Sequence, residues 1–319
     1  MHSGQQAMKT IVTHSVDDAA EIIKHGGLAA FLTETVYGLG ANAFDDAAVK
    51  KIFAAKGRPS DNPLIVHVMS VEQIEELTVD LNDHGREFIA NFFPGPLTIV
   101  ARGSGKAARS ATARLETIAF RMPANKTARE LIEKSGVPLV APSANISGRP
   151  SPTTWQAVYE DLGGRIECIL KGEPTEIGLE STVVDCTGDV PVLLRLGAIS
   201  LEELQSVVPS TRFEKGETSG ETRSPGLKHK HYSPQAEVII VENDSQGLDM
   251  NGAYIGINKP SSDLAFLKIV SNPSRYAHEV FEFFRECDRR NIGVVYCEAV
   301  AEDGIGAALM DRLRRAAEK

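Results

Sequence analysis

Short apolar runs rich in β-branched residues alternate with amphipathic helical patterns along most of the chain, and no other feature constrains the fold as strongly. Such runs are typical of buried strands, whereas the segments between them repeat apolar residues at the period of a helix. The strand-like runs lie near Ile11 and at 28–33, 63–68, 97–101, 117–121, 137–142, 165–170 and 181–185. Alternating strands and helices predict an α/β domain with a large twisted sheet.

Three helices have recognisable signals. Val49, Ile52 and Phe53 recur at helical spacing within 48–55, after an aspartate that can cap the helix. The patterns Thr127-x-x-Glu130 and Ser200-x-x-Glu203 each fit a capping box and predict helices at 128–134 and 201–208.

The length of 319 residues exceeds what one hydrophobic core usually supports, so two domains are expected. Residues 211–235 are poor in apolar side chains and rich in Gly, Ser, Thr and Pro, which predicts a linker between a domain at 9–210 and a smaller unit at 236–319. Strand patterns at 236–242, 253–257 and 292–296, with helices at 277–290 and from Gly304, predict a small Rossmann-like α/β unit. It has no G-x-G-x-x-G motif, so nothing signals a nucleotide site of its own.

The composition narrows the functional classes. A formal net charge of −9 argues against a protein that coats nucleic acid or anionic lipid. The four cysteines lack metal-ligand spacing and are expected to be buried thiols of a reducing compartment. No apolar run is long enough to span a membrane, and residues 1–8 lack a signal-peptide core and are expected to be an unstructured extension. A cytoplasmic protein is therefore predicted.

The segment T-E-T-V-Y-G-L-G at 33–40 directly follows an apolar strand. Thr33, Glu34, Thr35 and Tyr37 are gathered there, before what we interpret as a Gly-x-Gly turn. Open α/β sheets bind ligands at the ends of buried strands, so this segment is a candidate site. An ordinary transition from strand to turn is the alternative.

Lys56 and Arg58 flank Gly57 at the predicted end of a helix, and Asn62-Pro63 follows closely. If the helix ends at Gly57, both cations project from its unwound end, where an ammonium and a guanidinium suit phosphate oxygens. The alternative is that they only complement the helix dipole. His67 lies on the next strand, and a lone histidine on a strand is more often a structural residue than a ligand-binding one.

The stretch A-P-S-A-N-I-S-G-R-P-S-P-T at 141–153 predicts a stiff loop rich in hydroxyl and N–H groups, able to cradle an anion, unless it is only a crossover loop. Arg121, Ser181 and Arg195 each lie at the end of a predicted strand. Motifs of hydrolases, kinases and zinc proteases are absent from the sequence. Cations and hydroxyls without an evident nucleophile favour a reaction driven by positioning and by charge stabilisation of phosphate.

Taken in order, these segments resemble the long, two-domain form of the YrdC-like threonylcarbamoyl-AMP synthase family. The resemblance runs from about residue 10 to the C-terminus and includes T-E-T-V-Y-G-L-G, Lys56-x-Arg58 with P-S-D-N-P-L-I-V-H-V, and P-G-P-L-T at 94–98. It continues with A-P-S-A-N-I-S-G, L-E-S-T-V-V-D and S-P-G-L-K-H-K-H-Y-S-P in the linker. One departure is Leu196, where the family usually has proline.

The resemblance implies an open, twisted mixed sheet with helices, and an enzyme that condenses L-threonine, bicarbonate or CO₂, and ATP with Mg²⁺ into L-threonylcarbamoyladenylate and pyrophosphate. The product is passed to a separate tRNA threonylcarbamoyl transferase. Lys56 and Arg58 become the candidate catalytic residues. The implied threonine-binding set is Thr35, His67, Arg121, Ala141 and Ser181. The implied ATP-binding set is Arg58, Asn62, Thr117, Ser143, Ser151, Arg195 and Tyr232, the last in the linker and folded over the nucleotide as a lid. No protein ligand to a metal is assigned.

Two other functions are open at this stage. One is an RNA-binding module, which the acidic charge and the lack of an aromatic stacking platform disfavour. The other is a carbamoyltransferase subdomain of hydrogenase maturation, which shares the α/β core but normally comes with zinc-finger and acylphosphatase segments that this chain lacks.

Overall fold

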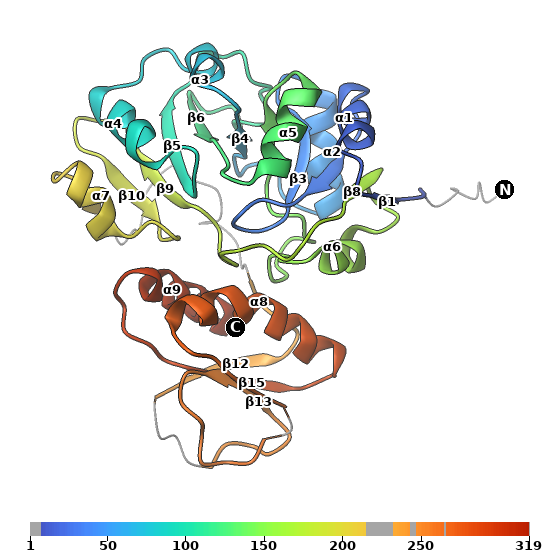
Figure 1. Ribbon diagram of the computed structural model, residues 1–319, viewed down its shortest axis with the longest axis vertical. Coiled ribbons are helices and arrows are strands. Elements are labelled where there is room, and N and C mark those ends of the chain that lie inside the picture. The colour runs from blue at the N-terminus through green and yellow to red at the C-terminus, as the bar shows by residue number, and fades with distance from the viewer. Residues whose placement is uncertain (1–7, 215–231, 243–246, 265, 319) are drawn as a thin grey trace.

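The computed structural model describes residues 8–214, 232–242, 247–264 and 266–318. They form two α/β units, each built around its own sheet (Figure 1). Residues 1–7 of the predicted extension and 215–231 of the predicted linker lie outside the described residues.

Within the described chain, the larger unit contains an eleven-stranded mixed sheet. Parallel and antiparallel neighbours alternate irregularly across it, and its longest strands lie near the middle. In spatial order the strands are β1 (Ile11–Thr13), β8 (Cys168–Leu170), β2 (Ala29–Phe31), β3 (Gly38–Asn42), β7 (Leu139–Val140), β4 (Ile65–His67), β6 (Thr117–Arg121), β5 (Leu97–Arg102), β9 (Thr182–Asp185), β10 (Val192–Arg195) and β11 (Arg212–Phe213).

Helices cover the two faces of this sheet unequally. One face forms the main core with α2 (Asp46–Lys56), α3 (Val71–Leu77), α4 (Asp83–Phe92), α6 (Trp155–Leu162) and α7 (Leu201–Val207). On the opposite face, α1 (Val16–Lys24) and α5 (Lys126–Ser135) cover the strands toward β8. The rest of that face carries a small apolar cluster, Ile65, Val100, Ala119 and Val183, to which no described helix contributes. This part of the sheet is therefore open to a ligand.

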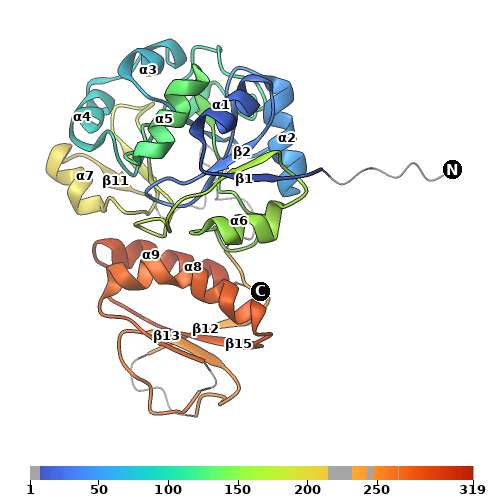
Figure 2. The same ribbon diagram turned by 45° about the vertical axis from the view of Figure 1, so that its right-hand side comes forward.

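The smaller unit is an all-parallel sheet in the order β12 (Glu237–Val241), β15 (Val294–Glu298), β13 (Ala253–Gly256) and β14 (Phe266–Ile269). Its helices, α8 (Pro273–Arg289) and α9 (Ile305–Ala317), both lie on the side of the sheet that faces the larger unit (Figures 1 and 2). The predicted fold class, an open mixed sheet with helices plus a smaller α/β unit, is confirmed.

Several local predictions can be compared directly. Gly57 ends α2 in the left-handed conformation, and Ser200 and Glu203 form the predicted capping box. The box predicted at Thr127 is wrong, because Asn125 caps α5 two residues earlier. The four cysteines are buried and unpaired, as expected. None of the described helices is both long enough and apolar enough to cross a membrane.

The predicted Gly-x-Gly turn in 33–40 is also wrong, because Gly38 begins strand β3, which pairs antiparallel with β2. Glycine is needed here for space rather than for a turn. A Cβ at Gly40 would lie 2.8 Å from the ring of Phe31 and 3.1 Å from the carbonyl oxygen of Ala29. The glycines thus let a phenylalanine lie flat across the neighbouring strand.

We expect Gly40→Ala to lower the free energy of unfolding by about 1–3 kcal/mol, because the new methyl group overpacks the contact with Phe31. Gly188→Ala is the matched control, since the nearest atom to its Cβ would be 4.0 Å away. It should change stability by less than about 0.5 kcal/mol. Urea denaturation of both variants measures the difference, and equal midpoints would contradict the steric explanation.

Candidate active site

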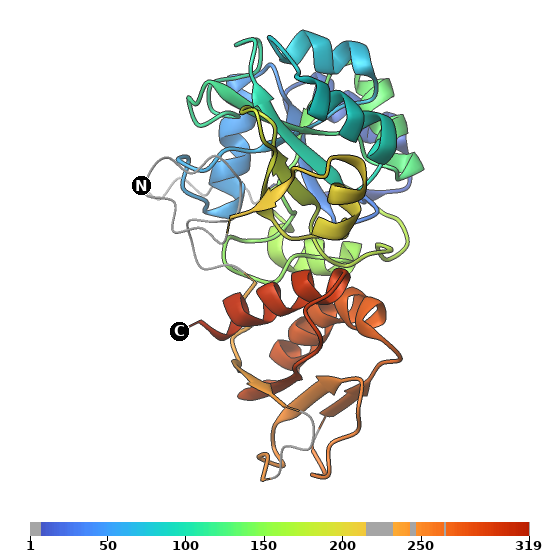
Figure 3. The same ribbon diagram turned by 90° about the vertical axis from the view of Figure 1, so that its left-hand side faces the viewer.

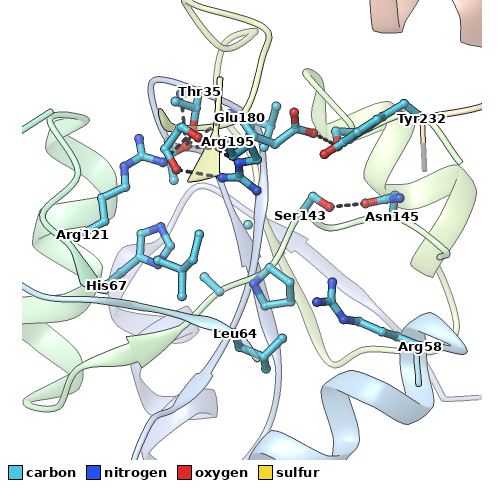
Figure 4. Close-up of a pocket in the computed structure, with 18 of the residues that line it drawn as sticks. Thr35, Arg58, Leu64, His67, Arg121, Ser143, Asn145, Glu180, Arg195 and Tyr232 are labelled. Carbon is cyan, nitrogen blue, oxygen red and sulfur yellow. Dashed lines mark hydrogen bonds between the residues drawn. The ribbon is translucent and has the colours of Figure 1, made fainter. Parts of the chain in front are cut away.

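A single cavity on the open face of the larger sheet collects most of the predicted site residues (Figure 4). They come from strand ends, from the end of α2, from the 33–37 segment, from the 141–153 loop and from the described end of the predicted linker. Those that line it are Thr35, Arg58, His67, Arg121, Ala141, Ser143, Ser151, Ser181, Arg195 and Tyr232. Lys56, Asn62 and Thr117 do not.

The strand register explains why side chains distant in sequence meet here. β4 and β6 are parallel, with Ile65 opposite Ala119 and His67 opposite Arg121. Because side chains alternate between the faces of a sheet, all four point to the open face. The two apolar residues form its floor, and the two polar ones stand at the strand ends, side by side in Figure 4.

Arg121 is fixed at one end of the cavity by three acceptors. Its guanidinium donates to Glu34 Oε1 (2.5 Å), Thr35 Oγ1 (2.8 Å) and the Gly95 carbonyl oxygen (3.1 Å). Burial opposes ionisation of Glu34, but the charge of Arg121 outweighs it and holds the pKa of that carboxyl below its usual value. An arginine has five N–H groups, so two remain for an anionic ligand.

His67 is buried beside Arg121, and its Nδ1 has no hydrogen-bond partner among the described residues. Burial, together with the neighbouring charge of Arg121, lowers the pKa of His67 to about 3. The imidazole is therefore neutral at ordinary pH. It is a poor proton acceptor, which disfavours a role as general base, and it can instead accept or donate a hydrogen bond to a ligand.

Ser181 and Arg195 are joined to each other at the adjoining wall. Arg195 donates from Nη2 to the Ser181 hydroxyl and from Nε to the Ser181 carbonyl oxygen, both at 3.0 Å. The same hydroxyl lies 2.8 Å from Thr98 Oγ1. A serine and a buried cation at strand ends thus form one polar group facing the cavity.

Lys56 departs from the prediction that it projects from the helix end toward an anion. It is buried in the last turn of α2, and its Nζ donates to the carbonyl oxygens of Ser143 (2.5 Å) and Asn145 (2.7 Å). Burial, and then the charge of Arg58, hold its pKa well below the usual range. Lys56 therefore fixes the 141–153 loop from beneath, and the loop, not Lys56, faces the cavity.

Arg58 does project as predicted, at the end of the cavity opposite Arg121 (Figure 4). Its one recorded hydrogen bond is long, 3.4 Å from Nη2 to the Pro63 carbonyl oxygen, and its buried Nε has no partner in the described structure. Burial lowers its pKa to about 10, so it remains charged. The nearby Asn62 is fully buried, and neither atom of its amide has a partner among the described residues. Unsatisfied donors of this kind fit a phosphate.

Thr117 starts β6, whereas Arg121 ends it, so the two lie about 13 Å apart along an extended strand. Thr117 lines a separate depression with Arg102, Arg109 and Arg114. Its predicted contact with ATP stays a prediction.

Tyr232 lies near the C-terminal end of the predicted linker and closes the cavity from the side of the smaller unit. Its ring stacks on Phe281 with centroids 5.5 Å apart, and the guanidinium of Arg312 lies 5.0 Å from its centre. Its backbone adopts a positive φ of 69°. These contacts tie the end of the linker to α8 and α9.

Three residues that lie at the cavity or hold its parts in place were not assigned a role from the sequence: Glu34, Asn145 and Glu180. Asn145 accepts from Ser143 Oγ (2.5 Å) and donates to the carbonyl oxygens of Ile146 and Arg149, so it shapes the loop. Each of the three stands next to or near an assigned residue in a matching motif. That position in the sequence is the signal that could have identified them.

The open mixed sheet, with a cavity of buried cations and hydroxyls on its uncovered face, defines an α/β enzyme that binds small anionic substrates. The Sua5/YciO/YrdC family model, described as telomere recombination, matches residues 21–197, and the model of the threonylcarbamoyl-AMP synthase C-terminal domain matches 199–318. The threonylcarbamoyl-AMP synthase of Pyrococcus abyssi is 44% identical over 315 residues, covering 93% of this chain and 92% of that protein. Its counterpart in Bacillus subtilis is 39% identical over 320 residues, covering 95% and 92%.

A solved structure supports the same relationship. The crystal structure of P. abyssi Sua5 complexed with L-threonine aligns with a TM-score of 0.88 at 40% identity, covering 98% of each chain. The chain belongs to the threonylcarbamoyl-AMP synthase family, and it is an enzyme of that kind.

The neutrality of His67 has a consequence for stability. Unfolding restores an ordinary pKa near 6.5, so between about pH 6.5 and 3 the unfolded state binds a proton that the folded state does not. Stability should therefore rise with pH through this window. The contribution of His67 between pH 5 and pH 7 amounts to about 2 kcal/mol.

We expect His67→Gln to remove this contribution, so that its free energy of unfolding varies less between pH 5 and 7 than that of the wild type. His14→Gln, at an exposed position, is the control and should keep the wild-type slope. Denaturant titrations at both pH values provide the comparison. Equal slopes for His67→Gln and the wild type would mean that the buried imidazole titrates normally.

Proposed function

We propose that this chain condenses L-threonine, bicarbonate or CO₂, and ATP into L-threonylcarbamoyladenylate and pyrophosphate, with the amino acid and the nucleotide at opposite ends of the one cavity. The positions of the two arginines support this assignment of the two substrates to opposite ends. Arg121 stands at one end and Arg58 at the other, with neutral His67 on the side of Arg121 (Figure 4). Two separate anion-binding groups suit an amino-acid carboxylate and a polyphosphate.

Threonine is assigned to the Arg121 end. The two free N–H groups of Arg121 bind its carboxylate, while His67 and the hydroxyls of Thr35 and Ser181 surround the rest of the molecule. The backbone at Ala141 completes this wall. The amine then adds to the carbon of CO₂, forming a C–N bond and releasing one proton. The low pKa of His67 argues that this proton leaves to solvent or to a substrate oxygen and is not stored on the imidazole.

ATP is assigned to the Arg58 end. A carbamate oxygen attacks the α-phosphorus, the bond to the β-phosphate oxygen breaks, and pyrophosphate leaves. Arg58 and Arg195 stabilise charge on the phosphates, and Ser143, Ser151 and Tyr232 position the nucleotide. Asn62 does not line the cavity, and its contact with ATP stays a prediction. Lys56 contributes by fixing the Ser143–Asn145 backbone and does not contact the phosphates.

Mg²⁺ enters with ATP as the MgATP substrate. Glu180 is the one carboxylate among the residues that line the cavity, and it is engaged by Ser151 and Arg312. No group of His, Cys, Asp or Glu side chains in the described chain is arranged to hold a metal ion. The ion would be held chiefly by phosphate oxygens and water, as Mg²⁺ commonly is.

Beyond the reaction itself, we assign the protein to the cytoplasm, with a tRNA threonylcarbamoyl transferase receiving its product. The described cysteines, all reduced and buried, are compatible with that compartment. The adenylate is a labile mixed anhydride, so water must be excluded from the cavity while it forms. We assign this role to the linker. Any RNA contact would be weak, because the chain is acidic overall.

Arg58→Ala is expected to reduce threonine- and bicarbonate-dependent release of pyrophosphate by about 100-fold or more, because a charged donor to the transition state is lost. Arg86→Ala is the control, since Arg86 is exposed on α4 and distant from the cavity, and it should stay within about twofold of the wild type. Pyrophosphate release and threonine-dependent ATP–pyrophosphate exchange are the two measurements. Near-normal turnover by Arg58→Ala would overturn the assignment of the ATP end.

A further inference from the structure

Two arginines of the smaller unit are completely buried against the larger one. Arg285, on α8, and Arg312, on α9, are each 1% exposed and are the largest fully buried side chains described. Both helices face the larger unit in every view (Figures 1–3). A buried guanidinium needs full pairing, so its partners show which parts of the larger unit it holds.

Arg312 connects directly to the wall of the cavity. Its Nε donates to Glu180 Oε2 and its Nη2 to the Leu196 carbonyl oxygen, both at 2.9 Å. The other oxygen of Glu180 accepts a hydrogen bond from Ser151 Oγ. Leu196 directly follows Arg195. Arg312 therefore holds the residues that directly adjoin Ser151 and Arg195, both of which we assign to ATP binding.

Arg285 supports the same wall at a second point. It donates to the Pro150 carbonyl oxygen at 2.5 Å and to both oxygens of Asp161 at 3.2 and 2.9 Å. Asp161 in turn accepts from the backbone N–H of Ile146 and from Arg149, which lines the cavity. The 141–153 loop is thus held by Lys56 from one side and by Arg285 from the other.

Burial of Glu180 would by itself disfavour its charge, but Arg312 first and then Arg195 outweigh this and hold its pKa below the usual value. If Arg312 is removed, Arg195 is the remaining cation that acts strongly on this carboxylate. Glu180 would then draw Arg195 toward itself, and Ser151 would lose a fixed acceptor. Both changes begin on the ATP side. Arg195 also donates to Ser181 of the threonine set, but the three contacts that fix Arg121 are untouched.

We propose that Arg312 is a positioning residue for the nucleotide: through Glu180 and the Leu196 carbonyl oxygen it holds Ser151 and Arg195 in the geometry that binds ATP. The smaller unit is in this way part of the ATP site without touching the nucleotide. This inference rests on the proposed function, and in particular on the assignment of the ATP end.

The experiment compares Arg312→Ala, Arg312→Lys and Arg314→Ala in the full-length chain. Arg314 is the control because it lies on the same helix, is exposed, and donates its hydrogen bonds to Glu302, which does not line the cavity. Separate KM values for ATP and threonine, kcat and the thermal midpoint are measured for each. We expect Arg312→Ala to raise the KM for ATP at least tenfold while the KM for threonine changes less than threefold. Arg314→Ala should keep both within twofold.

Two rescue tests separate positioning from mere stabilisation. Arg312→Lys restores a charge but not the fork, so its KM for ATP should lie between those of the wild type and Arg312→Ala. Added methylguanidine should lower the KM for ATP of Arg312→Ala by at least threefold and leave Arg314→Ala unchanged. If Arg312→Ala does not fold, Arg312→Lys carries the test and must raise the KM for ATP at least threefold.

The inference is overturned if folded Arg312 variants keep a normal KM for ATP, even with a lowered thermal midpoint, or if both substrates are affected equally. Failure of the proposed function would look different. In that case the wild-type enzyme itself would release no pyrophosphate in response to threonine and bicarbonate.

Discussion

Buried positive charge is the constraint on which the rest of this structure depends. Lys56, Arg58, Arg121 and Arg195 are enclosed within the larger unit of a protein whose net charge is −9. An isolated buried cation is strongly unfavourable, so each requires specific acceptors or a ligand. Carbonyl oxygens satisfy Lys56, and a carboxylate and a hydroxyl satisfy Arg121. These hydrogen-bond acceptors hold the cationic side chains in place, and the cavity is built from the side chains and loops that are held in this way.

The α/β class, the large sheet and many strand limits could be predicted from the sequence, because apolar alternation directly reflects burial. The order of the strands across the sheet could not, because it depends on pairing between distant segments. The strand at 117–121 matches its predicted range, and Arg121 and Arg195, which were predicted at strand ends, end β6 and β10 and line the cavity. The strand Gly38–Asn42 could not be predicted because G-L-G has the composition of a turn, and its glycines are explained by Phe31 and Ala141 on the two neighbouring strands or next to them. Local pattern carries no information about what lies across a sheet.

The direction of Lys56 could not be predicted for a similar reason. Its place at a helix end suggests projection, but the carbonyl oxygens that accept from it belong to residues 87 and 89 positions later in the chain. The arginines of α8 and α9 show the same limit more strongly. In the sequence they are ordinary charged positions on amphipathic helices. Their structural role depends on ion pairs with carboxylates more than 120 positions away in the chain. Sequence motifs identify the segments that form the site. Contacts between distant segments decide which residues of those segments face a ligand and which hold other residues in place.

The polar atoms left unpaired in the cavity complete the physical argument. The Nε of Arg58 and the Nδ1 of His67 both belong to residues that line the cavity, and both are buried without partners among the described residues. Each such group costs about 1–3 kcal/mol in the free protein, and a substrate that supplies the missing partner recovers that free energy on binding. The unpaired atoms are spread between the Arg58 side and the Arg121 side, so neither substrate alone recovers all of it. Under the proposed placement of the substrates, full satisfaction of these atoms requires both ligands at once, which would put the carbamate and the α-phosphate in the same cavity.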